Sequence, residues 1–206
     1  MSDKQSFGAA LREQRWDDHR FYHHSRVNQS LHLFSACCFL ASYALFAFDT
    51  ATAVWIGWVA AWVSRQIGHF FFEPKTYDTV NQMTHAEKEA VKVGYNLTRK
   101  YILLAVFLVS PLVLYFSPSL FGLIRPYTEV GSFGGDLSLL WLLIGAGALL
   151  GRTLQLFFIR DVQTGVVWFT KILTDPFNDV RTYWRAPYFL FVRGERLDPA
   201  LTHGAH

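Results

Sequence analysis

Residues Phe21 to His32 read F-Y-H-H-S-R-V-N-Q-S-L-H, and they lead directly into an apolar run, Leu31 to Phe48. Three histidines and an asparagine thus stand at the entrance of this run. A second polar cluster, Gly68 to Glu73 (G-H-F-F-F-E), closes the next apolar run, Ala51 to Phe72. Only Asp49-Thr50 separates the two runs, and so short a turn predicts an antiparallel helical hairpin. The two polar clusters should therefore lie next to each other at one end of the hairpin.

The composition is typical of a membrane protein. The chain has 206 residues, of which 51% are hydrophobic and 17% charged, against about 25% charged in ordinary soluble domains. Four runs approach or exceed the roughly 20 residues that a helix needs to cross a bilayer: 31–48, 51–72, 101–116 and 137–159. A Gly-rich loop at 131–136 should precede the last run. We therefore expect an all-α fold, a single polytopic membrane domain with about four transmembrane helices, a polar segment at 1–30 and a basic, aromatic tail at 160–206.

The basic residues predict the orientation. Five Lys or Arg residues lie in 1–30, five in the polar loop 73–100 and six from residue 160 onward, whereas the two opposite loops share only Arg125. This positive-inside bias places both termini and the 73–100 loop on the cytoplasmic side, in the endoplasmic reticulum or a bacterial inner membrane. The net charge of +3 comes from these juxtamembrane residues, so it does not indicate nucleic-acid binding.

The spacing within the two polar clusters fits a metal site. Asn28 and His32 are four residues apart, as are His69 and Glu73, so each pair shares a helix face. Imidazole and carboxylate groups bind iron, zinc or manganese. Two or three imidazoles and a carboxylate, with open positions left on the metal, form the arrangement in which non-haem Fe(II) binds oxygen.

One condition applies to the first cluster. His23 and His32 are nine residues apart, which on one straight helix separates them by about 13 Å. They can share a metal only if His23 precedes the helix, with Ser25 as its N-cap. Arg65, near the end of the second run, should snorkel or pair with Glu73 rather than take part in the chemistry. The alternative is that all these groups are interfacial and structural.

The two motifs together resemble a known family. Tyr22-His23-His24-x3-Asn28-x3-His32 before one span, and Gly68-His69-x2-Phe72-Glu73 at the end of another, are similar to the small membrane-embedded 2-hydroxy fatty acid dioxygenases of fatty acid α-oxidation. The resemblance covers roughly residues 18 to 75. It implies Fe(II)-dependent cleavage of a long-chain 2-hydroxy fatty acid by O2, which gives CO2 and an acid one carbon shorter.

The resemblance also assigns residues. The iron ligands would be His23, His32 and His69, with His24 as a further candidate. Glu73 would be a ligand or an orienting partner, Asn28 would lie beside the ligands, and these two are the catalytic candidates. The expected partners are a long-chain lipid substrate, O2 and the bilayer, with no nucleic acid and with a homo-oligomer left open.

Two other functions remain open. The first is a di-metal fatty acid hydroxylase or desaturase. The pattern His19-x3-His23-His24 vaguely resembles the histidine boxes of those enzymes. Those enzymes use about eight histidines in boxes, whereas two of the eight in this chain, His203 and His206, fall in the last residues. The second is a non-enzymatic membrane scaffold or lipid-binding subunit, which the aromatic, basic tail and the helix-packing glycines Gly147 and Gly151 would fit.

Overall fold

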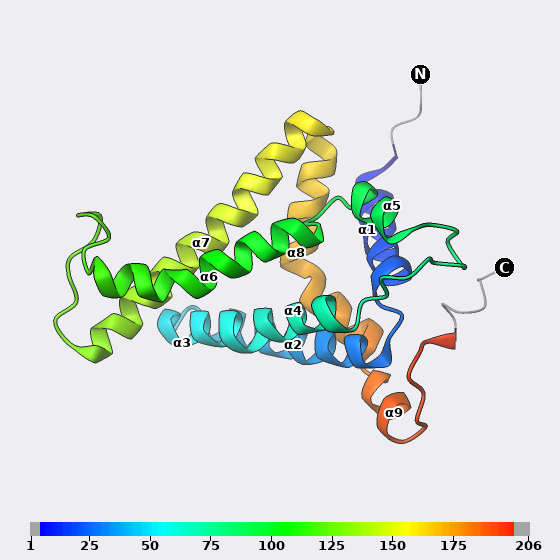
Figure 1. Cartoon of the computed structure of the whole chain (residues 1–206), viewed down its shortest axis with the longest axis horizontal. Helices are drawn as coiled ribbons and strands as arrows, with labels where there is room; N and C mark the ends of the chain where they lie inside the picture. Colours follow the sequence, from blue (N-terminus) through cyan, green and yellow to red (C-terminus); the bar gives the residue numbers. More distant parts are fainter. Residues whose placement is uncertain (1–4, 200–206) are drawn as a thin grey trace.

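The computed structural model describes residues 5–199, apart from the side chains of residues 130 and 131, and this part of the chain is helical without a strand (Figure 1). His203 and His206 lie outside the described residues. The all-α class is confirmed. The elements are α1 (Phe7–Tyr22), α2 (Arg26–Leu45), α3 (Thr50–Trp55), the π-helix η1 (Ile56–Trp62), α4 (Val63–Phe71), α5 (His85–Val91), α6 (Leu97–Phe116), α7 (Val130–Ile159), α8 (Val162–Tyr183) and α9 (Ala186–Phe191).

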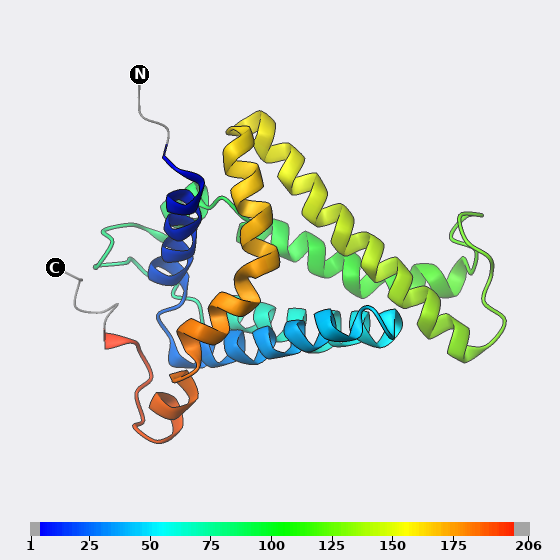
Figure 2. The same ribbon diagram turned by 180° about the vertical axis from the view of Figure 1, so that it is seen from behind.

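The predicted hairpin is present. The helix α2 packs along η1 and α4 in antiparallel orientation, and the two arms lie side by side in both views (Figures 1 and 2). Asp49 ends the turn as the N-cap of α3, because its side chain accepts a hydrogen bond from the Thr52 amide at 3.0 Å. Farther along, Ser42 donates to the Ala53 carbonyl at 2.7 Å. The consecutive elements α3, η1 and α4 form the second arm, and we call this arm the 50–71 rod.

Two helices are long and apolar enough to cross a membrane, by length and composition: Leu97–Phe116, which is α6, and Ser132–Ile159 of α7. Only 22% and 17% of their apolar windows are buried inside the molecule. The core helix of a soluble protein would be mostly buried, so these exposed apolar surfaces fit a lipid environment better. Among the described residues, α2 and the 50–71 rod do not meet the same criterion, since polar residues occupy the first turns of α2 and η1 interrupts the rod.

One expectation about the second half of the chain is wrong, and another part of it has more structure than the composition indicated. The predicted Gly-rich loop at 131–136 is helical, because α7 already begins at Val130. Its start is stabilised by a capping interaction, in which Ser132 Oγ accepts a hydrogen bond from the Glu129 amide at 3.1 Å. The predicted tail at 160–206 contains a long helix, α8, that packs against α1, α2 and α7. Its buried Val167 and Trp168 explain this packing.

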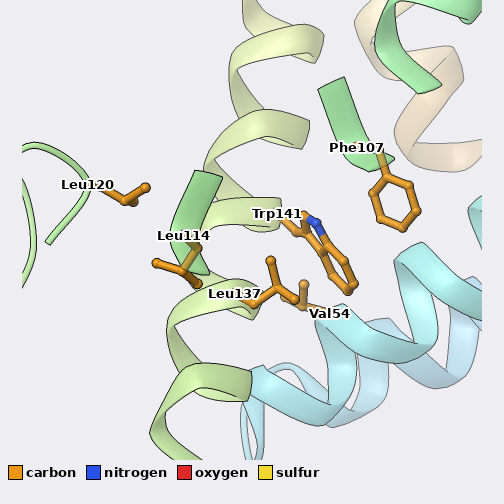
Figure 3. Packing of buried hydrophobic residues seen from close by; sticks show 6 residues of the cluster. All are labelled: Val54, Phe107, Leu114, Leu120, Leu137 and Trp141. Carbon is orange, nitrogen blue, oxygen red and sulfur yellow. The ribbon is translucent and has the colours of Figure 1, made fainter. Parts of the chain in front are cut away.

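The apolar core lies where α6 and α7 meet the outer end of the hairpin (Figure 3). Its buried members are Val54, Phe107, Leu114, Leu120, Leu137 and Trp141. The indole of Trp141 donates a hydrogen bond to Ser110 Oγ at 2.9 Å, and the Trp58 and Phe107 rings stack at 5.1 Å. These contacts hold α6 and α7 against each other and against the hairpin, at the end of the hairpin that lies away from the histidines.

Candidate metal centre

Three buried histidines converge at the other end of the hairpin. One nitrogen of each of His23, His32 and His69 lies within 4.8 Å of the other two. The ring centroids of His32 are 4.0 Å from His23 and 5.0 Å from His69. Two nitrogens bound to one metal at about 2.1 Å are at most about 4.2 Å apart, so a small inward movement completes a three-histidine site. The group could therefore hold a metal ion.

The chain geometry satisfies the condition set by the sequence. The helix α1 ends at Tyr22 and α2 begins at Arg26, with Ser25 in the N-cap position. His23 therefore lies in the break between α1 and α2 and is not part of α2. From this position its ring can reach His32. Ser25 makes no capping hydrogen bond through its side chain, so the break depends on other contacts, such as that of the Arg26 amide with the Arg196 carbonyl at 2.9 Å.

His23 is held by a tyrosine from α8. Its Nδ1 lies 2.7 Å from the Tyr183 hydroxyl, which also lies 3.0 Å from His19 Nδ1. If His23 Nδ1–H donates to Tyr183 and Tyr183 donates to His19, the Nε2 atom of His23 is left free. Burial, reinforced by the neighbouring His69, holds the pKa of His23 well below its ordinary value. The ring is then neutral at pH 7, which is the form that binds a metal.

His69 is held by a carboxylate of its own helix end. Its Nδ1 lies 2.7 Å from Glu73 Oε2, and the other carboxylate oxygen lies 3.4 Å from the Lys92 ammonium. A carboxylate that accepts the second ring N–H is the usual support of a metal-bound histidine, because it fixes the tautomer and the ring orientation. Of the two roles expected for Glu73, the structure thus shows the contact of an orienting partner.

His32 is fully buried and neither of its ring nitrogens forms a hydrogen bond with the described residues. An unsatisfied buried nitrogen is costly, and a metal ion would satisfy one of the two. Nδ1 lies 3.6 Å from Asp179 Oδ2, an oxygen that likewise accepts no hydrogen bond from residues 5–199. Arg65 lies 3.0 Å from the same oxygen, at ion-pair distance but without hydrogen-bond alignment. We expected Arg65 to snorkel or to pair with Glu73. In the structure it pairs with Asp179 instead.

The catalytic candidate Asn28 lies beside this group and braces the hairpin. It is fully buried, and its Nδ2 donates to the Tyr22 carbonyl at 3.0 Å. Its Oδ1 lies so close to Gly68 that a Cβ atom there would be only 2.2 Å away. A glycine is thus required at position 68 for α2 and α4 to approach each other closely, which brings His32 and His69 together.

The structure does not bring His24 into the cluster. Its Nε2 contacts the Arg20 carbonyl and lies 3.8 Å from Asp78 Oδ2. Adjacent residues point in different directions where the chain leaves a helix. His24 therefore faces the 73–84 segment while His23 faces the metal group.

The sequence interpretation missed the contribution of α8. Tyr183 and Asp179 both come from this helix, which crosses the histidine end of α2 in both views (Figures 1 and 2). A signal was present, because Lys171, Asp175, Asp179 and Tyr183 recur every four residues and so lie along one side of the helix. In the structure this side faces polar partners inside the molecule, among them Arg65 and His23.

A cavity of about 760 Å³ opens from the three histidines into the space between α2, the 50–71 rod, α6, α7 and α8. This volume lies within the range of about 300–1,000 Å³ that is usual for small-molecule sites. Beyond the histidines its wall is mostly apolar and aromatic, with side chains such as Phe39, Tyr43, Trp58 and Trp62. The arrangement can therefore place an apolar chain next to a metal.

Comparison of the chain with protein-family models, with curated proteins and with solved structures finds no match. The resemblance to the 2-hydroxy fatty acid dioxygenases consequently rests on the two histidine motifs alone.

Proposed function

We propose that the protein is a membrane-embedded, Fe(II)-dependent dioxygenase that acts on long-chain 2-hydroxy fatty acids. The observation that carries this proposal is the convergence of three buried histidines at the mouth of an apolar cavity. One of the three, His32, has no hydrogen bond to any residue of the part that the structure describes. The overall reaction would convert one 2-hydroxy acid and one O2 into the shortened acid, CO2 and water.

The residues support this chemistry in different ways. Iron bound by His23, His32 and His69 would supply the site at which O2 and the hydroxy acid react, with coordination positions left open by a three-histidine set. Tyr183 and Glu73 would keep the imidazoles in the orientation that presents one nitrogen to the metal. The apolar wall would hold the hydrocarbon chain and exclude water from the reacting end.

The proposal includes four membrane spans with both termini on the cytoplasmic side. In addition to α6 and α7, α2 and the 50–71 rod would cross the bilayer as the tightly packed hairpin. The turn between α2 and α3 and the 117–129 segment lie at one end of the molecule, whereas α1, α5 and the described ends of the chain lie at the other (Figures 1 and 2). The basic residues gather at the second end, as the positive-inside rule requires.

The first test is the metal content of the full chain purified without oxygen in detergent. We expect one iron per chain in the wild type and its loss in His69→Ala, since removal of one of three ligands opens the site. His24→Ala is the matched control, because His24 neighbours a proposed ligand but points away from the group. This variant should keep its iron.

Activity completes the test. The iron-loaded wild type should consume O2 and release CO2 from a 2-hydroxy fatty acid, and His69→Ala should not. Two metals per chain would instead favour a di-metal hydroxylase. A folded wild type that takes up no added Fe(II) would contradict the dioxygenase and favour a scaffold or lipid-binding subunit.

A further inference from the structure

Among the described residues, the cavity wall contains one Lys or Arg side chain that has no ion pair. Lys100 lies in the first turn of α6, is 9% exposed and lines the same cavity as His32 and His69. Lys100 therefore faces the same space that the polar end of a bound molecule would occupy in order to meet the histidines.

Lys100 differs from the other buried lysines in its surroundings. Lys88 pairs with Asp78 at 3.4 Å, and Lys171 pairs with two carboxylates at 2.5 and 2.6 Å. Within residues 5–199, by contrast, no hydrogen bond or ion pair reaches the Lys100 ammonium group. No carboxylate of the described residues lies within ion-pair distance, so this buried cation has lost its water without gaining a direct partner, which is unfavourable. An anion in the cavity would remove this penalty.

We propose that Lys100 binds the acidic headgroup of the substrate and thereby sets the reacting end of the molecule against the histidines. The inference rests on the proposed function for the reaction, but the binding step itself needs no metal. Lys100 is thus a specificity-determining residue, which selects amphipathic acids over neutral lipids of the same chain length.

The charge balance of the cavity favours a carboxylate. The other cationic side chains of its wall already have carboxylate partners: Arg20, Arg65, Lys92 and Lys171. Lys100 is the cation of the described wall that has no ion pair, and one ammonium group matches a single negative charge, whereas a phosphate monoester carries nearly two. The hydrocarbon chain would then extend away from Lys100 along Trp58 and Trp62.

The test is equilibrium binding of hexadecanoic acid and of hexadecanol to the full chain in detergent, at about pH 6, where a free carboxyl group is ionised and an amine is protonated. Neither ligand carries the 2-hydroxyl group, so neither is consumed. Bromine-labelled forms of both ligands report binding by quenching tryptophan fluorescence, because Trp58 and Trp62 line the cavity. The variants are Lys100→Met, which keeps the length without the charge, and Lys100→Arg, which keeps the charge.

We expect Lys100→Met to weaken binding of the acid about 10- to 100-fold, the size of a charge-assisted contact, and to leave binding of the alcohol within about twofold. Lys100→Arg should retain most of the acid binding. Lys100→Gln replaces Lys100→Met if the latter melts at a much lower temperature than the wild type.

Two results would overturn the inference: acid binding unchanged in Lys100→Met, or equal loss of acid and alcohol. Hexadecyl phosphate is a third ligand, and a preference of the wild type for this ligand over the acid would contradict the carboxylate assignment. The measurements are repeated after removal of metal with a chelator. Failure of the dioxygenase proposal would leave the contrast between acid and alcohol in place, so the two ideas fail separately.

Discussion

At the scale of single residues, Glu73 and His69 have different roles in the proposed site, and the difference can be tested. In Glu73→Gln the side chain can still accept a hydrogen bond from His69 Nδ1–H, but the negative charge that strengthens the bond is gone. We expect the affinity for Fe(II) to fall about 10- to 100-fold, as is usual for such supporting groups. Competition with a coloured chelator measures this affinity.

The matched control is Glu89→Gln, which removes the other carboxylate near the Lys92 ammonium, at 3.1 Å, without touching a histidine. Its iron affinity should equal that of the wild type. If Glu73→Gln bound iron as tightly as the wild type, Glu73 would have no orienting role. If it bound none at all, Glu73 would be a ligand.

At the scale of elements, α8 is attached to α1 through a partly buried ion triplet. Lys171 lies between Asp18 of α1 and Asp175 of its own helix. Burial opposes ionisation of Asp18, but Lys171 outweighs it and holds the pKa of Asp18 below its ordinary value. A carboxyl group whose pKa is lowered by folding stabilises the fold above its unfolded pKa of about 4, and this contribution disappears as the pH falls below that value.

Lys171→Met should therefore have two effects. It leaves Asp175 buried with only the weaker contacts to Arg15, at 3.4 Å, and Arg65, at 3.9 Å, among the described residues, which should destabilise the fold by about 3 kcal/mol near neutral pH. It should also make the loss of stability in acid smaller. In the variant Asp18 has lost its ion-pair partner Lys171, so protonation of Asp18 no longer breaks an ion pair. Melting temperatures of both proteins in detergent between about pH 3 and pH 7 measure these effects. A parallel fall in both proteins would contradict the role of the triplet.

The comparison of sequence and structure also belongs to the scale of elements. The hairpin and the approach of His32 to His69 were predictable, because a short turn places the far ends of its two arms side by side. The inclusion of His23 was predictable only on the condition that His23 precedes the helix. Asp179 and Tyr183 were not, because they reach the site only through the packing of α8, which depends on contacts about 150 residues away in the sequence. Lys100 was not predictable either, since the absence of a partner is visible only in the folded chain.

At the scale of the whole molecule, the proposed four-span topology predicts which loops can be labelled from each side. In a chain with Cys37 and Cys38 replaced by alanine, single cysteines at the exposed positions Tyr77 and Leu123 should react with a membrane-impermeant maleimide from opposite sides. Leu123→Cys should be labelled in intact cells or sealed vesicles from the non-cytoplasmic side. Tyr77→Cys should react only after permeabilisation. Labelling of both from one side would show that α6 does not cross the bilayer.

The π-helix η1 in the 50–71 rod has a consequence for how this arm can vary. Successive residues of an α-helix are rotated by about 100° about the helix axis. A π turn holds an extra residue, so it rotates the following side chains by about that angle relative to a regular α-helix. Trp58 faces α6, and His69 on the same arm faces α2. The angle between these two side chains about the helix axis is thus set by the number of residues in η1. Removing a single residue there would leave the arm almost as long, but would turn His69 about a quarter of the way round. Rotational register, more than length, is therefore the property of this arm that the site depends on.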